Sequence, residues 1–311
     1  MRVLALELGG THVSCGAVED RKLLESVRIE VDSRKNLAEL LPDLQQVLHG
    51  LMARHPGAYA GLGFGFCGLV NTREGKVLST NGKFSDATAI DLPAWAQDAF
   101  GLPMVLENDA RMALLGEWRA GSARGCDDVV MITLGTGIGT AVLCGGRLLR
   151  GKHFQAGCLG GHFTVAPGGR LCSCGARGCF EAEASTYALA NMSRAWPGFG
   201  TSSLAQEDST EFETLFRSAE HGDAVAMEIR EHCIQIWSAC ALSLVHAYDP
   251  ELIVLGGGVM KNGYPLLRRL QAHVHEQAWT PWGKVQFRPA ALGSNAALLG
   301  AEPLIEQQHA L

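Results

Sequence analysis

The sequence lacks any long apolar run. None of its apolar stretches approaches the ~20 consecutive residues that a helix needs to cross a bilayer, so no membrane contact is expected. The first residues, MRVLALELGGTHVSC, contain only a short apolar run before two glycines, which differs from the apolar core of a signal peptide. We therefore expect a cytoplasmic protein.

An excess of positive charge is also missing. The chain has 26 Lys and Arg against 32 Asp and Glu, a net charge of -6. Because nucleic-acid affinity depends largely on lysine and arginine side chains that neutralise phosphates, no nucleic-acid partner is expected. The composition, 47% hydrophobic and 19% charged, is that of a globular protein, and 311 residues predict two domains. A small-molecule substrate remains.

Two common nucleotide-binding motifs are absent. No Gly-Lys-Ser/Thr follows a glycine turn, which excludes a Walker A loop, and no glycine cluster has the spacing and downstream acid of the dinucleotide fingerprint. Two glycine hairpins are present instead, LALELGGTHVSCGAV at 4–18 and VMITLGTGIGTAVL at 130–143. Exposed amides in such turns favour phosphate oxygens. Two matching copies predict a duplicated domain with a phosphate-binding hairpin in each half.

A third glycine segment follows an apolar stretch. Glu251 to Leu255 reads as a buried strand, Gly256, Gly257 and Gly258 follow it, and a helix is predicted at about 265–277. A strand, a glycine turn and a helix N-terminus suit a nucleotide contact, and the same pattern also occurs as a plain tight turn.

The remaining pattern predicts an α/β fold, because apolar strands alternate with amphipathic stretches. We expect helices near 36–54, 110–119, 186–196, 222–248 and 294–307, and strands near 60–66, 104–107, 128–134 and 285–288.

A carboxylate follows one of these strands. Asn108 and Asp109 lie where the apolar run from Pro103 to Leu106 gives way to a helix. An isolated pair of this kind most often caps the helix. Phosphoryl transfer to an alcohol, however, needs a carboxylate that accepts the hydroxyl proton. In a chain with two phosphate hairpins, Asp109 is the best candidate for that base.

Ten cysteines raise a separate question. A disulfide framework is not expected in a large chain without an export signal. Four cysteines crowd around His162 in HFQAGCLGGHFTVAPGGRLCSCGARGCFEAEAS, residues 153–185, and could form a metal site, a redox device or packing. The others lie in apolar surroundings and are expected to be reduced and buried; they are Cys15, Cys67, Cys126, Cys144, Cys233 and Cys240.

Taken in chain order, these motifs resemble one family. The two hairpins, ENDAR, H-x9-C-x-C-G-x-x-G-C-x-E and VLGGGV look like the ROK family of sugar kinases and sugar-responsive repressors, over essentially the whole chain. The resemblance implies a two-domain actin-like ATPase (ribonuclease H-like) α/β fold with the active-site cleft between the domains. The implied N-terminal domain is 1–118 plus 293–311, and the C-terminal domain is 119–292.

The resemblance also implies roles for residues. Asp109 corresponds to the general base of an ATP-dependent hexose kinase that acts at the 6-hydroxyl, and family members are often oligomers, so a homodimer is expected. Residues implied to bind ATP and Mg²⁺ are Glu7, Gly9, Gly10, Thr11, Gly135, Thr136, Gly137, Gly256, Gly257 and Gly258. Residues implied to bind the sugar are Gly68, Asn81, Asn108, Asp109, His162 and Glu181.

The same resemblance answers the cysteine question. His162, Cys172, Cys174 and Cys179 supply one nitrogen and three sulfurs, a set that suits a structural tetrahedral Zn²⁺. A closed site of four ligands leaves no position for a catalytic water, so zinc is expected to shape the sugar pocket.

Three positions depart from the family pattern. Glu7 stands where aspartate is usual, and His12 where lysine is more common. The family's G-E-x-G-H reads AGCLGGH here, so no carboxylate occurs between residues 155 and 161. A sugar kinase remains the first hypothesis, and a sugar-binding regulatory protein without catalysis is the alternative. A repressor is not expected, because the first hairpin begins within ten residues of the start.

Overall fold

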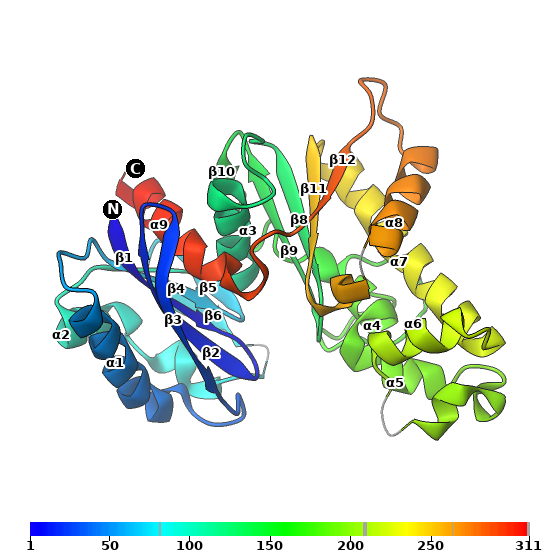
Figure 1. Cartoon of the computed structure of the whole chain (residues 1–311), viewed down its shortest axis with the longest axis horizontal. Helices are drawn as coiled ribbons and strands as arrows, with labels where there is room; N and C mark the ends of the chain where they lie inside the picture. The colour runs from blue at the N-terminus through cyan, green and yellow to red at the C-terminus, as the bar shows by residue number, and fades with distance from the viewer. Residues whose placement is uncertain (81, 208–209, 263, 310–311) are drawn as a thin grey trace. The chain divides into compact units, whose positions relative to one another are not determined.

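The computed structural model describes residues 1–80, 82–207, 210–262 and 264–309 (Figure 1). The chain divides into two compact units. The first combines Met1–Gly125, Leu148–Ala156 and Ala291–Leu311, and the second combines Cys126–Arg147 and Gly157–Ala290. Among the described residues, no helix has the length and apolar character needed to cross a membrane.

The first unit is built on a five-stranded sheet in the order β3-β2-β1-β4-β7. Its first three strands form antiparallel pairs, and β4 and β7 continue the sheet parallel to β1. The predicted first hairpin is therefore β1 with β2. The strands are β1 (Arg2–Leu8), β2 (His12–Glu19), β3 (Lys22–Glu30), β4 (Leu62–Phe66) and β7 (Met104–Asn108), with a separate pair, β5 (Leu69–Asn71) and β6 (Lys76–Ser79); the helices are α1 (Leu37–Arg54), α2 (Leu92–Phe100), α3 (Asp109–Ala120) and α9 (Ala296–His309).

Strand β4, with the sequence LGFGF, shows how the helices cover the two faces of this sheet. Its large side chains, including Phe64 and Phe66, are fully buried in a core with residues of α1 and α2. Gly63 points the other way, where a Cβ atom would lie 2.6 Å from the Cβ of Ala301 in α9. The two helical layers lie on opposite sides of the sheet (Figure 1). Small residues on the second face let α9 approach closely.

Glu117 of α3 binds two segments of the first unit that are far apart in the sequence. It is fully buried, and its carboxylate accepts hydrogen bonds from the amide of Ser122 (2.8 Å) and the amides of Ala291 (3.1 Å) and Leu292 (2.8 Å). Ser122 lies just before the chain first leaves the first unit, and Ala291 is the residue at which it returns for the last time. One carboxylate thus holds both segments on α3.

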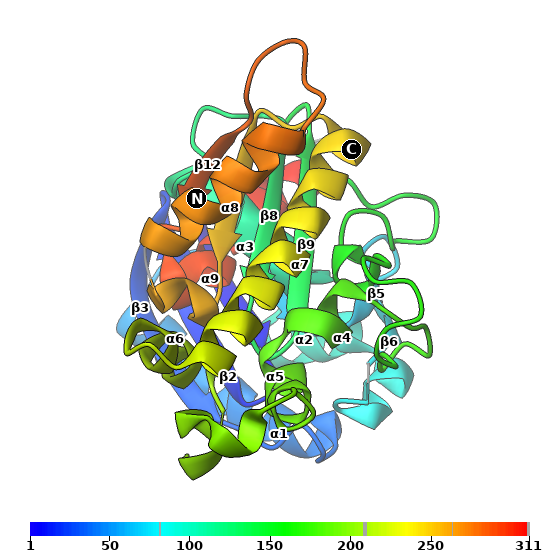
Figure 2. The same ribbon diagram turned by 90° about the vertical axis from the view of Figure 1, so that its right-hand side faces the viewer.

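The second unit repeats the same strand order, β10-β9-β8-β11-β12. Here β8 and β9 are antiparallel, and β11 and β12 run parallel to β8, so two equivalent sheets agree with the predicted duplication. Helices α7 and α8 lie side by side over this sheet (Figure 2). The strands are β8 (Val129–Leu134), β9 (Ile138–Cys144), β10 (Arg147–Leu148), β11 (Leu252–Gly256) and β12 (Gln286–Pro289); the helices are α4 (Phe180–Ala184), α5 (Thr186–Arg194), α6 (Phe212–Glu220), α7 (Ala224–Tyr248) and α8 (Tyr264–Gln277).

The scattered cysteines are free, and five of the six are buried as predicted. The prediction is wrong for Cys144, which is exposed. It is the last residue of β9, and the Gly145–Gly146 turn that follows carries its side chain out of the sheet core.

Candidate functional site

Three neighbouring strand ends gather polar residues in the first unit. The parallel strands β1, β4 and β7 pair Leu8 with Phe66 and Phe66 with Asn108. Their carboxyl ends therefore lie at one edge of the sheet, which is where ligands bind in α/β folds. Gly9 and Asp109 follow directly after two of these ends.

Asp109 is the first residue of α3, and its side chain is held on both sides. Its carboxylate accepts hydrogen bonds from the amide of Ala110 (2.8 Å) and from the side-chain amide of Asn108 (2.9 Å). Asn108 also donates to the carbonyl of Gly68 (3.1 Å) and accepts from the amide of Arg111 (3.2 Å), so it is the N-cap of α3. The capping alternative thus holds for Asn108, and the cap orients Asp109.

Two carboxylates share this edge of the sheet. Burial raises the pKa of Asp109, while the Ala110 amide and the charge of Lys83 act in the opposite direction. Burial also raises the pKa of Glu7 to about 7, and the negative charge of Asp109 adds to that effect. A cation favours the ionised form of nearby acids. This pair of hard oxygen donors therefore fits a divalent ion such as Mg²⁺.

The first hairpin turn closes tightly beside these acids. The amide of Gly9 donates to the carbonyl of His12 (2.9 Å), and the side chain of Thr11 is exposed. A Cβ atom on Gly10 would lie 3.1 Å from Cε of Lys83 and 3.2 Å from its Nζ. The turn thus has an ammonium group against its second glycine.

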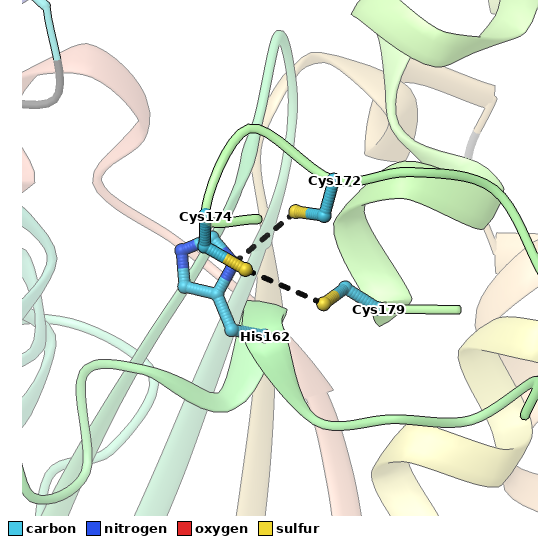
Figure 3. A group of neighbouring side chains, drawn as sticks. All are labelled: His162, Cys172, Cys174 and Cys179. Carbon is cyan, nitrogen blue, oxygen red and sulfur yellow. Dashed lines mark hydrogen bonds between the residues drawn. The ribbon is translucent and has the colours of Figure 1, made fainter. Parts of the chain in front are cut away.

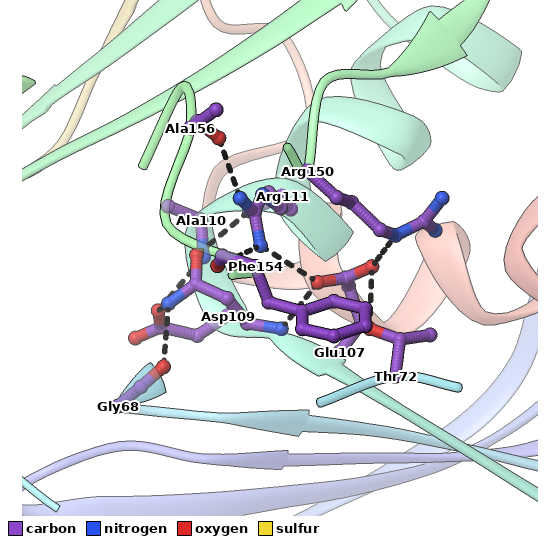
Figure 4. A network of polar contacts seen from close by, with 10 residues as sticks. Gly68, Thr72, Glu107, Asp109, Ala110, Arg111, Arg150, Phe154 and Ala156 are labelled. Carbon is purple, nitrogen blue, oxygen red and sulfur yellow. Dashed lines mark hydrogen bonds and ion pairs between the residues drawn. The ribbon is translucent and has the colours of Figure 1, made fainter. Parts of the chain in front are cut away.

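A buried charge network lies behind Asp109 (Figure 4). Glu107 and Arg111 are both 0% exposed and form an ion pair of 3.3 Å. The other carboxylate oxygen of Glu107 accepts from Arg150 (2.6 Å) and from the hydroxyl of Thr72 (3.2 Å). The amide of Asn108 donates to Glu107 as well (2.9 Å). The junction between β7 and α3 is therefore held by a buried carboxylate whose charge is balanced by two arginines.

Arg111 also holds the segment Leu148–Ala156, which belongs to the first unit. Its guanidinium donates to the carbonyls of Phe154 (3.1 Å) and Ala156 (2.5 Å). Phe154 has a φ of 60°, which is uncommon for a residue with a side chain. Arg111 thus ties this unusual loop to the helix that begins with Asp109.

In the second unit the hairpin turn between β8 and β9 carries Gly135, Thr136 and Gly137. Glu181, in the first turn of α4, accepts a hydrogen bond from the amide of Ile138 (2.8 Å). A Cβ atom on Gly137 would lie only 2.5 Å from that carboxylate. Glu181 is therefore in contact with the second hairpin.

His162, Cys172, Cys174 and Cys179 converge in the same unit (Figure 3). Nδ1 of His162 lies 3.5 Å from Sγ of Cys172, and the sulfurs of Cys174 and Cys179 are 3.6 Å apart. In a tetrahedral zinc site with ordinary bond lengths, these separations would be roughly 3.6 Å and roughly 3.8 Å. The four side chains fit Zn²⁺.

The backbone of residues 162–179, here called the knuckle, explains why these four side chains converge. Gly175 and Gly178 have φ angles of 90° and 74°, and a Cβ atom on Gly178 would lie 1.6 Å from the carbonyl oxygen of Ala166. Burial raises the pKa of the Cys179 thiol to about 12, so a bound cation is needed to stabilise its thiolate.

The segment without the usual acid, AGCLGGH, is packed on β9. Thr140 donates its hydroxyl to the carbonyl of Gly157 (2.8 Å) and accepts from the amide of Gly160 (2.8 Å). A Cβ atom on Gly161 would lie 2.2 Å from the carbonyl oxygen of Ile138. Neither Cys158 nor Leu159 offers a carboxylate.

The third glycine segment lies at the end of β11. Gly257 has a φ of 91°, and a Cβ atom there would lie 2.2 Å from the carbonyl oxygen of Leu134, the last residue of β8. Gly256 is buried, Gly258 begins a short helical turn, and α8 follows. The turn thus lies close to the second hairpin.

The predicted site residues divide between the two units. The first contains Glu7, Gly9, Gly10, Thr11, Gly68, Asn108 and Asp109, and the second contains Gly135, Thr136, Gly137, His162, Cys172, Cys174, Cys179, Glu181, Gly256, Gly257 and Gly258. Asn81 lies outside the described residues.

Sequence reasoning missed four charged residues near Asp109. Glu107 and Arg111 flank Asn108 and Asp109 in ENDAR, and their spacing of four residues could have indicated an ion pair. Lys83 and Arg150 lie in loops without periodic pattern, so nothing in the sequence indicated them.

The chain is similar to known proteins over nearly its whole length. The sequence profile described as ROK family matches residues 3–308. A glucokinase of Thermotoga maritima is 30% identical over 315 residues, 99% of this chain and 98% of that protein. Together with the structures below, this confirms the predicted actin-like fold.

Two solved structures are also similar. A ROK hexokinase from Thermus thermophilus has a TM-score of 0.85 and 30% identity, covering 100% of this chain and 99% of that one. A ROK family glucokinase from Streptomyces griseus, in complex with glucose and AMPPNP, has a TM-score of 0.80 and 29% identity, covering 99% and 100%.

Proposed function

Since the chain belongs to the ROK family and is an ATP-dependent sugar kinase, we propose that it phosphorylates a hexose or hexose derivative at the 6-hydroxyl, with Asp109 as general base. The observation that carries this proposal is the position of Asp109. It lies at the carboxyl end of β7, half-buried, beside Glu7 and the first glycine turn. A carboxylate there is suited to accept the proton of an attacking hydroxyl.

Asn108 orients that base. Both hydrogens of its side-chain amide are donated within the unit, to Gly68 and to Asp109. Oδ1 of Asp109 accepts from Asn108 and from the amide of Ala110, so Oδ2 takes part in neither bond and is available to the hydroxyl proton. A direct contact between Asn108 and the sugar would exchange one of its present bonds.

The two glycine hairpins and Glu7 would hold ATP and Mg²⁺. Exposed amides in the turns suit phosphate oxygens, and the carboxylate suits the ion. When bound, Mg²⁺ neutralises charge on the phosphates. We assign the two compact units to the ATPase domains expected at 1–118 plus 293–311 and at 119–292.

Zn²⁺ would be held by the His162 and cysteine cluster and would act structurally. Because the knuckle carries His162 and leads into Glu181, the ion would shape the surroundings of both side chains. Four protein ligands leave no coordination position for a reacting water.

The substrate should be a hexose that lacks, inverts or modifies the hydroxyl normally bound by the missing glutamate. Losing one charged hydrogen bond costs about 1.5 to 3 kcal/mol, or roughly 10- to 150-fold in affinity. Such a loss is tolerable when the substrate does not present that hydroxyl.

The test is a coupled ADP-release assay over hexoses, amino sugars and N-acetylated sugars. Asp109→Asn should abolish turnover and leave sugar binding intact, since asparagine keeps the shape but cannot accept the proton. Asn71→Asp, in β5, serves as a control for a comparable amide and carboxylate exchange. Retained activity in Asp109→Asn would refute the mechanism.

The absent carboxylate also favours a second candidate, a regulatory sugar-binding protein. In that case no sugar supports turnover, and one or more raise the melting temperature. We further infer that the protein is cytoplasmic and forms a homodimer. Light scattering of the purified protein tests the oligomeric state.

A further inference from the structure

Lys83 lies across the first phosphate turn. Its side chain packs on Gly10, where a Cβ atom would meet Cδ at 3.5 Å, Cε at 3.1 Å and Nζ at 3.2 Å. Its charge also opposes the rise in the pKa of Asp109 that burial causes. The ammonium group is therefore close to both the glycine turn and the carboxylate that follows β7.

The backbone around Lys83 is anchored. Its amide donates to the carbonyl of Thr80 (2.9 Å), and the amide of Phe84 donates to the carbonyl of Ser33 (2.7 Å). The ring of Phe84 is 1% exposed and belongs to the core of the first unit. The Lys83 side chain thus starts from a fixed point and is itself half-buried.

The hairpin itself supplies little positive charge. Burial, and then the charge of Arg28, lower the pKa of His12 against the opposing charge of Glu30, so the protonated imidazole is disfavoured. Arg28 is largely exposed and forms an ion pair with Glu30 (3.3 Å). The acids Glu7 and Asp109 face the same edge. Apart from Mg²⁺, positive charge for a phosphate group at this turn would therefore have to come from outside the hairpin.

We propose that Lys83 is a phosphate-binding residue of this site, where its ammonium contacts the phosphoryl group that is transferred. The proposal rests on the kinase function proposed above and adds a residue to it. An ammonium is a compact point charge with three donors, so it can follow a phosphoryl group as charge moves during transfer. Gly10 is then required for two reasons, because it exposes its amide and because it leaves room for Lys83.

The test compares Lys83→Met and Lys83→Arg with Lys76→Met. Lys76 is 68% exposed and pairs with Glu74 on the surface, so its loss removes the same charge from an exposed ion pair. We expect kcat of Lys83→Met to fall about 100-fold, the usual effect of removing one transition-state donor. Lys83→Arg should recover part of this loss, and Lys76→Met should keep the activity of the parent protein.

Calorimetric titration separates a phosphate contact from a structural role. Lys83→Met should bind the Mg²⁺ complex of AMPPNP about tenfold more weakly and that of ADP within about threefold, because the lost charged bond is to the terminal phosphate. A structural role would lower the melting temperature and weaken both ligands alike. Lys83→Gln provides a second, polar variant if the methionine variant does not fold.

The outcomes are distinguishable. If the parent protein phosphorylates a sugar and Lys83→Met does so within about threefold, the Lys83 proposal is overturned and the proposed function stands. If the parent protein turns over no sugar, the proposed function fails, and the AMPPNP and ADP titrations still decide the Lys83 proposal. Equal affinities in the parent protein and in Lys83→Met would overturn it.

Discussion

Replacement of Glu107 by glutamine removes a carboxylate that is fully buried against two arginines. Arg111 is 0% exposed and Arg150 is 23% exposed. Glutamine keeps the size of the side chain and can still bond Thr72, so the change is mainly one of charge. Arg111 would then be a buried cation without its ion-pair partner.

Breaking a buried ion pair costs about 3–5 kcal/mol. The carbonyls of Phe154 and Ala156 still solvate Arg111 after the change, which favours the lower end of that range. We therefore expect Glu107→Gln to lower the free energy of unfolding of the first unit by about 3 kcal/mol, a large part of the 5–15 kcal/mol typical of a domain. The amide of Asn108 loses a charged acceptor, so activity should fall as well.

The double variant Glu107→Leu with Arg111→Met removes both charges together. Its cost should be smaller than the sum of the costs of the two single changes by about 2–3 kcal/mol, because the fully buried charges of Glu107 and Arg111 are removed together and Arg150, which stays, is 23% exposed. Arg217→Met is the control. That arginine is 52% exposed and pairs with Glu207 on the surface, so its loss should cost less than about 1 kcal/mol.

Native-state hydrogen exchange with mass spectrometry is the suitable assay, because a chain of two units need not unfold in one step. Peptides from β7 and α3 report the opening free energy of the network directly. A cost below about 1 kcal/mol for Glu107→Gln, or additive costs in the double variant, would refute the reasoning.

Four further predictions concern other residues. Cys174→Ser should lose zinc, measured by metal analysis, and sugar phosphorylation together; zinc-free protein with full activity would contradict this. Glu117→Ala should lower the melting temperature strongly, because three partly buried backbone amides lose a fully buried acceptor. The rate profile should show an acid limb shifted to higher pH than the ordinary pKa of aspartate would give, because burial raises the pKa of Asp109 and delays ionisation of the base. Stability of the ligand-free protein should fall as pH rises from 4.5 to about 7, because folded Glu7 holds its proton more tightly than unfolded Glu7 does; Glu7→Gln should flatten that slope in thermal melts.

Much of the fold was predictable because periodic segments are long. Both hairpins and the helices α1, α3, α7 and α9 were predicted within a few residues. Helix α6 was missed although Phe212, Leu215, Phe216 and Ala219 have the spacing of a buried helical face. Strand β3 was missed because charged residues interrupt KLLESVRIE, which lies at the sheet edge and has no fully buried position.

The site was predictable only where a motif carries it. The zinc cluster could be predicted because its residues lie within a short stretch of sequence. Lys83 and Arg150 could not be predicted, because their roles depend on contacts with residues far away in the chain, Gly10 and Glu107. Burial of charge depends on such distant pairing and leaves no local pattern.

Helix α9, at the very end of the chain, covers the glycine face of β4. During synthesis on the ribosome this helix emerges long after β1, β4 and α3. One face of the first sheet therefore stays uncovered until α9 has been synthesised. The segment Cys126–Arg147 and the whole of Gly157–Ala290 emerge in the interval. The second unit can therefore fold while the chain is still growing, whereas the first, which begins earlier, is completed last.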